Sequence, residues 1–172
     1  MSIVEQPQSE AEDAVALRVR HAQASDIAAV TGLDERNTGM QKPDYWEDMF
    51  ERFGNHPERL FLVAEGGKGQ LLGFIIGEVR AWEFGSPPCG WIFALGVDPS
   101  VRLKKIGSRL FAAICERLAR AGVSTVRTML ARDDDLNMAF FRSQGMMGGP
   151  FIQLEMPLAA DRANVARRGA KG

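Results

Sequence analysis

Three basic residues gather in one short segment, immediately before a stretch with helical periodicity. Arg102, Lys104 and Lys105 lie ahead of Gly107, and the helical pattern begins at Ile106. The first N–H groups of a helix have no partner within the helix, and the helix dipole is positive at that end, so both attract an anion. The segment therefore indicates a phosphate or pyrophosphate site, with a solvated basic loop as the alternative.

A strand and a helix are expected to hold this loop. Nearly every residue from 91 to 97 is apolar, aromatic or glycine, which is typical of a strand buried on both faces, and Pro99 ends it. Gly122 follows the helical pattern and suits a left-handed helix cap. The apolar residues of the expected helix recur at helical spacing, namely Ile106, Leu110, Ala113, Ile114 and Leu118.

The strand end and the loop together resemble the acyl-CoA loop of the GNAT N-acetyltransferase superfamily. There, Arg or Gln-x-x-Gly-x-Gly/Ala follows a Val-x-Pro strand end; Val97, Pro99, Arg102 and Gly107 match, whereas Lys105 replaces the first glycine. A residue with a side chain pays about 1–2 kcal/mol for the left-handed backbone that glycine adopts freely. Lys105 either offsets this cost by an ammonium–phosphate contact or marks a weakened cofactor site.

The resemblance implies which residues hold acetyl-CoA. The backbone of the strand end would pair with the pantetheine arm, and the loop would hold the pyrophosphate. The residues so assigned are Leu95, Gly96, Val97, Arg102, Leu103, Lys104, Lys105, Ile106, Gly107 and Ser108.

A second segment resembles the same family. A strand is expected over residues 124–130, followed by a helix that ends at Gly145. In this family Asn-x-x-Ala-x-x-Leu/Phe-Tyr is common here, which implies that Asn137, Phe140 and Phe141 belong to the cofactor site. Phe141 stands where many relatives carry a tyrosine acid, and Met129 stands where some carry a glutamate base. Neither side chain can transfer a proton.

The acceptor side is expected in residues 38–57 and in the loop at residues 81–90. Glu83 is the candidate catalytic base, with Glu35 as a second candidate, and Tyr45 is the second catalytic candidate and belongs to the acceptor side. An aromatic stripe at helical spacing predicts a helix that either packs into the core or forms one wall of an acceptor pocket. The stripe consists of Trp46, Met49, Phe50 and Phe53.

The rest of the chain supplies the remaining strands. Alternating residues at 17–20 predict a first strand, Ser25 is expected to cap a helix, and residues 60–80 read as a hairpin. Residues 150–158 predict a last strand. The expected fold is α/β (α+β), the GNAT fold, with a central mixed, mostly antiparallel twisted sheet of about six to seven strands and about four helices. Residues 17–158 would form this domain, between an acidic arm at 1–16 and a basic tail at 159–172.

Composition narrows the function classes. The chain has 172 residues and a net charge of -1, so no broad basic surface for nucleic acid is implied. No apolar run reaches a membrane span and no signal peptide is evident, so we expect a cytoplasmic protein with no membrane partner. Cys89 and Cys115 suggest neither a metal site nor a disulfide framework, and no histidine lies near Cys89 in sequence to make it a nucleophile.

These patterns lead to one expectation and one alternative. The expected protein is an acyltransferase that moves an acetyl group from acetyl-CoA to a primary amine of a small molecule or protein, without a metal. The alternative is a GNAT-fold module that binds or senses acyl-CoA without turnover. A homodimer is also expected, because the apolar last strand at residues 150–156 would leave an unpaired edge.

Overall fold

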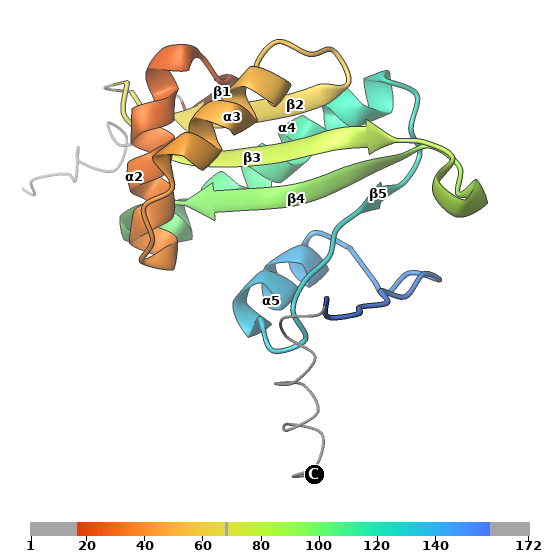
Figure 1. The fold of residues 1–172 in the computed structure, drawn as a ribbon. Helices are drawn as coiled ribbons and strands as arrows, with labels where there is room; N and C mark the ends of the chain where they lie inside the picture. Colours follow the sequence, from red (N-terminus) through yellow and green to blue (C-terminus); the bar gives the residue numbers. More distant parts are fainter. Residues whose placement is uncertain (1–16, 68, 159–172) are drawn as a thin grey trace, which may run out of the picture. The chain divides into compact units, whose positions relative to one another are not determined.

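A five-stranded sheet forms the centre of the fold in this computed structural model (Figure 1), which describes residues 17–67 and 69–158. Adjacent strands are antiparallel except the last pair, which is parallel. The strands follow one another in the order β1-β2-β3-β4-β5. They are β1 (Arg18–His21), β2 (Arg59–Glu65), β3 (Leu71–Arg80), β4 (Cys89–Val97) and β5 (Val126–Arg127).

Four α-helices accompany the sheet in the described part of the chain. Figure 1 shows α2 and α3 on one face of the sheet and α4 on the other. The chain divides into two compact units between Asp135 and Leu136, and the last helix belongs almost entirely to the second unit. The helices are α2 (Ile27–Thr38), α3 (Pro43–Phe53), α4 (Ile106–Arg120) and α5 (Asp135–Ser143), with 3-10 turns η1 (Ala24–Asp26), η2 (Glu83–Gly85) and η3 (Pro99–Lys104).

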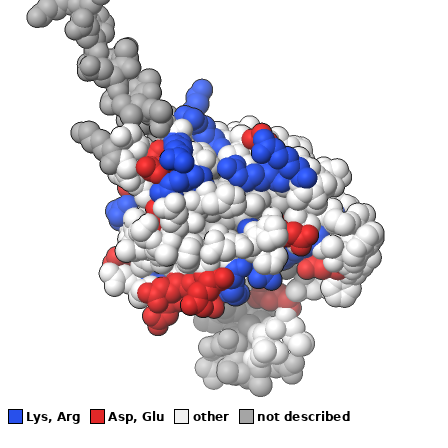
Figure 2. Space-filling model, turned by 90° about the horizontal axis from the view of Figure 1, so that it is seen from above, with Lys and Arg blue, Asp and Glu red and all other residues white. Residues whose placement is uncertain are grey.

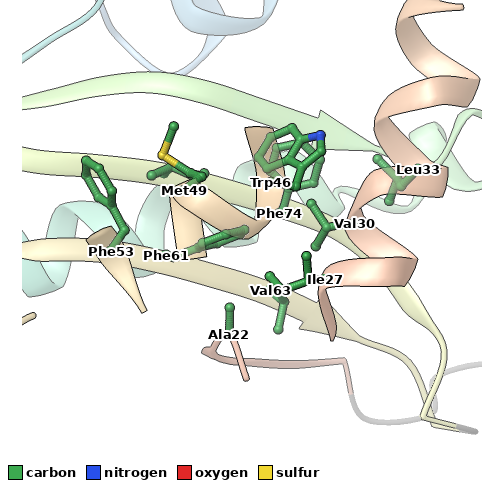
Figure 3. Packing of buried hydrophobic residues seen from close by; sticks show 11 residues of the cluster. Ala22, Ile27, Val30, Leu33, Trp46, Met49, Phe53, Phe61, Val63 and Phe74 are labelled. Atoms are coloured by element: carbon green, nitrogen blue, oxygen red, sulfur yellow. The ribbon is translucent and has the colours of Figure 1, made fainter. Parts of the chain in front are cut away.

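The core on the face of α2 and α3 combines aliphatic and aromatic side chains (Figure 3). Trp46 lies in T-shaped contact with Phe74, with ring centroids 4.9 Å apart, and is 2% exposed. Its indole Nε1 donates to the buried Asp34 carboxylate at 3.0 Å, which satisfies its polar edge and links α3 to α2. The stripe predicted on α3 is therefore mainly a packing stripe, although two of its residues, Met49 and Phe53, also line a pocket described below.

On the opposite face, α4 approaches the sheet closely because glycines stand beneath it. A Cβ at Gly73 would lie 3.0 Å from Leu110, and one at Gly90 would lie 2.6 Å from Leu118. Side chains at these strand positions would push the helix away from the sheet. The buried α4 residues are Ile106, Leu110, Phe111, Ile114 and Leu118.

The sequence predicts the helices, the hairpin and the mixed α/β class correctly, but it predicts too many strands. Residues 150–158 form no strand, and Ile152 and Leu154 are 84% and 86% exposed. A strand needs a ladder partner, and among the described residues none pairs with this segment. The prediction at residues 124–130 shrinks to Val126–Arg127. The homodimer was predicted from this last strand, which the structure does not form, so the dimer stays an untested expectation.

The start of the first helix also differs from the prediction. Ser25 is not a helix cap, because residues 24–26 form a 3-10 turn. The Asp26 carboxylate accepts the Gln23 N–H at 2.7 Å and binds both terminal nitrogens of Arg20, at 2.6 and 2.9 Å. The hydrogen bonds from Arg20 lower the pKa of Asp26, and Arg20 also reaches Glu65. A bidentate ion pair therefore fastens the start of α2 to β1 and β2.

Some expectations concern parts or properties that lie beyond these elements. The arm at 1–16 and the tail at 159–172 lie outside the described residues. No helix in the part that the structure describes is long and apolar enough to cross a membrane. Among the described side chains, no three His, Cys, Asp or Glu residues gather as metal ligands.

Candidate functional site

The loop before α4 ends in a residue with an unusual backbone. Lys105 has φ 57° and ψ 23°, the left-handed conformation, and its side chain is exposed. The first hydrogen bond of the helix runs from the Arg109 N–H to the Lys105 carbonyl at 3.1 Å. The helix therefore supplies no i−4 carbonyl for the N–H groups that precede Arg109, as at every helix start. The helix has neither a side-chain cap nor an acidic residue in its first turn, so its positive end is available to an anion.

Asp98 organises the other end of this loop. Its carboxylate accepts hydrogen bonds from the Ser100 N–H at 3.0 Å and the Ser100 hydroxyl at 2.7 Å, and it pairs with Arg36 of α2 at 2.9 Å. These contacts lower the pKa of Asp98, and the hydrogen bond from the Ser100 hydroxyl has the largest effect. Asn37 of α2 donates to the Val97 carbonyl at 3.2 Å. The end of β4 is therefore anchored to α2 where the loop begins.

The edge of β4 between the loop and the start of the strand is open. Its parallel pairing with β5 is limited to Gly90 with Val126 and Trp91 with Arg127. Among the described residues, Ile92 and residues 94–97 have a strand partner on the β3 side only. An open edge presents alternate N–H and C=O groups that can pair with an extended ligand.

A β-bulge interrupts β4 at Phe93. Ile76 pairs with Ala94 while the next residue, Gly77, pairs with Ile92, so Phe93 is the additional residue. A bulge leaves the additional residue out of the ladder and twists the strand locally. Gly96 has a packing role in the same strand, because a Cβ there would lie 2.5 Å from the Phe74 ring.

A pocket of about 360 Å³ lies beside this bulge. Its volume falls near the lower end of the range for small-molecule sites, about 300–1,000 Å³. Its walls come from α3 and from the strands β2, β3 and β4. The lining residues are Tyr45, Met49, Arg52, Phe53, Arg59, Glu78, Arg80 and Phe93.

Glu78 is the one carboxylate among the pocket-lining residues. Its Oε1 accepts a hydrogen bond from Arg80 Nε at 2.8 Å, and its side chain is 20% exposed. The Arg80 guanidinium lies over the Trp91 ring at 4.6 Å, which fixes the arginine that orients the carboxylate. Glu78 thus combines partial burial, a set orientation and access to the pocket.

Comparison with known proteins identifies the family. A sequence model described as the Acetyltransferase (GNAT) family matches residues 27–146. The chain belongs to this family. The mycothiol acetyltransferase of Kocuria rhizophila is 33% identical over 86 residues, covering 50% of this chain and 28% of that protein. The mycothiol acetyltransferase of Nocardia farcinica is 26% identical over 89% of this chain and 46% of its own length. The chain thus spans less than half of these relatives.

Solved GNAT acetyltransferases share the fold. An aminoglycoside N-acetyltransferase in complex with CoA superposes with a TM-score of 0.73 at 15% identity, over 84% of this chain and 97% of the other. An aminoglycoside 6'-N-acetyltransferase from Acinetobacter baumannii gives a TM-score of 0.71 at 13% identity, over 84% and 100% of the two chains. At these identities the likeness concerns the fold alone.

The structure separates the two catalytic residues expected from the GNAT resemblance. Tyr45 lines the pocket and is 42% exposed. Glu83 is exposed in η2 and is not a lining residue. Glu35, the second candidate base, also lies outside the lining and accepts a hydrogen bond from Gln41 at 3.0 Å. Their catalytic roles stay predictions, but the pocket carboxylate is Glu78.

The predicted cofactor residues fall into four groups. Leu95, Gly96 and Val97 lie on the open edge of β4, and Lys105, Ile106, Gly107 and Ser108 surround the start of α4. The backbone of Arg102, Leu103 and Lys104 forms part of η3, and their side chains lie outside what is described. Asn137, Phe140 and Phe141 lie on α5 in the second unit.

Sequence reasoning missed Glu78, although a signal was present. In a strand, alternate residues share a face, so Phe74, Ile76, Glu78 and Arg80 lie on the same side of β3. A glutamate that continues an apolar core stripe is a candidate pocket residue. Recognising Glu78 from the sequence would have required knowing that α3 packs on this face of β3 and leaves a pocket beside Glu78.

Proposed function

We propose that this GNAT-family protein transfers an acetyl group from acetyl-CoA to the primary amine of a small molecule. The observation that carries the proposal is the placement of two features along β4. The pocket with its carboxylate adjoins Phe93, and the uncapped start of α4 follows Val97 through η3. About 13 Å of open strand edge joins them, from four residues at about 3.3 Å each.

The donor groups fit the cofactor. The positive end of the α4 dipole, with no acidic residue in the first turn, and the exposed Lys105 ammonium suit a pyrophosphate, since both favour negative charge. The backbone of residues 95–97 suits the amides of a pantetheine arm, because an open strand edge offers donors and acceptors in alternation. Bound acetyl-CoA would supply a thioester carbonyl as the acyl donor.

Glu78 is the residue that we assign to proton removal. An amine attacks only when uncharged, so its ammonium form must lose a proton before or during attack. Glu78 lies in the pocket, accepts one hydrogen bond from Arg80 through Oε1, and retains acceptor capacity at Oε2. It is better placed for this role than Glu83, which is exposed and outside the lining.

Other residues of the pocket position and shield the acceptor. The bulge at Phe93 frees backbone polar groups at the point where the acceptor pocket adjoins β4, and such groups can stabilise developing negative charge. Met49 and Phe53 exclude water from the pocket wall. The Tyr45 hydroxyl orients the amine at the exposed side.

The names of the similar proteins support acetyl transfer, and two of the solved neighbours are named N-acetyltransferases. Turnover of the purified protein tests the proposal directly. Acetyl-CoA incubated with a panel of primary amines should release free thiol at a rate that depends on the amine. CoA binding without any amine-dependent release would instead favour the non-catalytic binding module.

A further inference from the structure

We infer that the acceptor amine also carries an anionic group, a carboxylate or a phosphate, which Arg59 binds. The inference deepens the proposed function: it rests on that proposal for the reaction of the amine, whereas binding of the anionic group is a separate property of the pocket. Four observations support it, namely the contacts of Arg59, the pairing of the opposite strand, the charges of the lining and the size of the pocket.

Arg59 is held in place without a carboxylate partner. Its Nη1 donates to the Arg52 carbonyl at 3.2 Å, and its guanidinium carbon lies 5.5 Å from the centre of the Phe53 ring. The residue is half-buried, and none of the described Asp or Glu side chains lies within ion-pair distance of it. A guanidinium has five N–H donors in a fixed fork, so most remain for a planar anion such as a carboxylate.

The strand register makes this arrangement unexpected. Arg59 of β2 stands directly opposite Glu78 of β3, and opposed residues share a face with Cβ atoms about 4.5–5.5 Å apart. Such a pair ordinarily invites an ion pair, yet Glu78 binds Arg80, two residues along its own strand. A carboxylate and an arginine thus face the same pocket with separate partners. A ligand with an ammonium and an anionic group can satisfy both.

The lining carries an excess of positive charge. It contains three arginines and one glutamate. Arg80 is neutralised by Glu78, and Arg52 by Asp48 at 2.7 Å, which leaves the charge of Arg59. An acceptor with several ammonium groups would place one of them near Arg59. The repulsion between the two positive charges would select against such an acceptor.

The outer face of α3 has the opposite sign but acts weakly on the pocket. Asp44, Glu47, Asp48 and Glu51 are exposed on this helix, and Figure 2 shows acidic side chains gathered at one margin of the surface. Exposed charges are screened over about 8–10 Å at physiological salt. Groups within the partly enclosed pocket are screened less, so Arg59 dominates recognition of a bound anion.

The size and apolar walls define the remainder of the ligand. A volume of about 360 Å³ suits a single small molecule. Met49, Phe53 and Phe93 offer apolar surface next to the two charged groups. An apolar amino acid has an amine, an anionic group and an apolar side chain. A phosphorylated small amine has the amine and the anionic group but no apolar side chain.

Matched acceptor pairs test the inference. L-phenylalanine is compared with phenylalaninamide, which keeps its shape but lacks the carboxylate, and phosphoethanolamine is compared with ethanolamine. The wild-type protein should use the anionic member of at least one pair with a KM about 10-fold lower or more, and the pair that shows it identifies the anion. Arg59→Gln should raise that KM about 10–100-fold, with kcat little changed.

Two further variants control for folding and for charge alone. Arg59→Lys keeps the charge but loses the fork, so its KM should lie between those of wild type and Arg59→Gln. Arg120→Gln removes an exposed arginine of α4 that pairs with Glu116, and it should change no KM. Circular dichroism and the melting temperature of each variant show whether it folds.

Calorimetric titration of the same amines without acetyl-CoA separates this inference from the proposed function. Turnover that does not distinguish the members of either pair, or an equal effect of Arg59→Gln on both members, overturns the inference while the acetyltransferase function stands. Arg59-dependent binding of an anionic amine without turnover of any amine supports the inference and refutes the function. Absence of both overturns both.

Discussion

Replacing Lys105 by glycine should make the protein more stable, although the change removes a side chain. Lys105 has φ 57° and ψ 23°, where a residue with a Cβ pays about 1–2 kcal/mol. Glycine avoids that cost but loses about 0.4–1 kcal/mol more to the entropy of the unfolded chain. The expected net gain in the free energy of unfolding is therefore about 0.5–1 kcal/mol.

Urea unfolding followed by circular dichroism measures this gain. For a chain of this size the melting temperature should rise by about 1–4 °C. Lys105→Ala keeps the Cβ and the strain, so its stability should stay close to that of the wild type. Gly122→Ala makes the reverse change at φ 87°, where an added Cβ would meet no atom within 4 Å, and it should lose about 1 kcal/mol for backbone reasons alone.

Equal stabilities of Lys105→Gly and Lys105→Ala would refute the reasoning. That result would mean that residue 105 does not hold the left-handed conformation in solution. The direction in which the start of α4 points depends on this turn, so the anion site would then lose its structural basis.

Three further outcomes are expected. Asp26→Asn should lower stability by about 1.5–3 kcal/mol at pH 7; because Arg20 lowers the pKa of Asp26, this contribution is present in full above the ordinary aspartate pKa of about 3.9 and is lost as pH falls through the lowered pKa of the folded state, so the difference between wild type and variant in urea unfolding should shrink steadily below about pH 4. Glu78→Gln should lower kcat about 10²–10⁴-fold, whereas Glu83→Gln should leave it unchanged; the opposite pattern in thiol-release assays would return the base to Glu83. Tyr45→Phe should change the KM of the amine more than kcat, and a large fall in kcat alone would make Tyr45 the acid.

Local pattern was sufficient to predict most elements and the anion loop. Helical spacing located α3 and α4, and the motif drew attention to Lys105, whose left-handed backbone the structure now shows. Gly122 and Gly145 also have the expected positive φ, at 87° and 90°. These features depend on residues close together in sequence, which is why the sequence alone reveals them.

The rest depends on tertiary pairing that no local pattern encodes. Glu78 and Arg59 face one pocket only because β2 and β3 pair in a particular register, and the bulge at Phe93 requires β4 to be aligned against β3. At residues 150–158, by contrast, the sequence predicted a strand that the structure does not form. The apolar residues of this segment resemble a strand, but the described residues provide no ladder partner for it.

CoA binding to Gly107→Glu tests the account most directly. A glutamate in the first turn of α4 interacts favourably with the helix dipole, by about 0.3–1 kcal/mol, so the fold should persist. Its carboxylate would, however, occupy the anion site and repel the pyrophosphate of CoA. Ala112→Glu makes the same charge change at an exposed position of α4. Calorimetry should show CoA binding abolished in Gly107→Glu and retained in Ala112→Glu and wild type. Unchanged CoA affinity in Gly107→Glu would contradict the assignment.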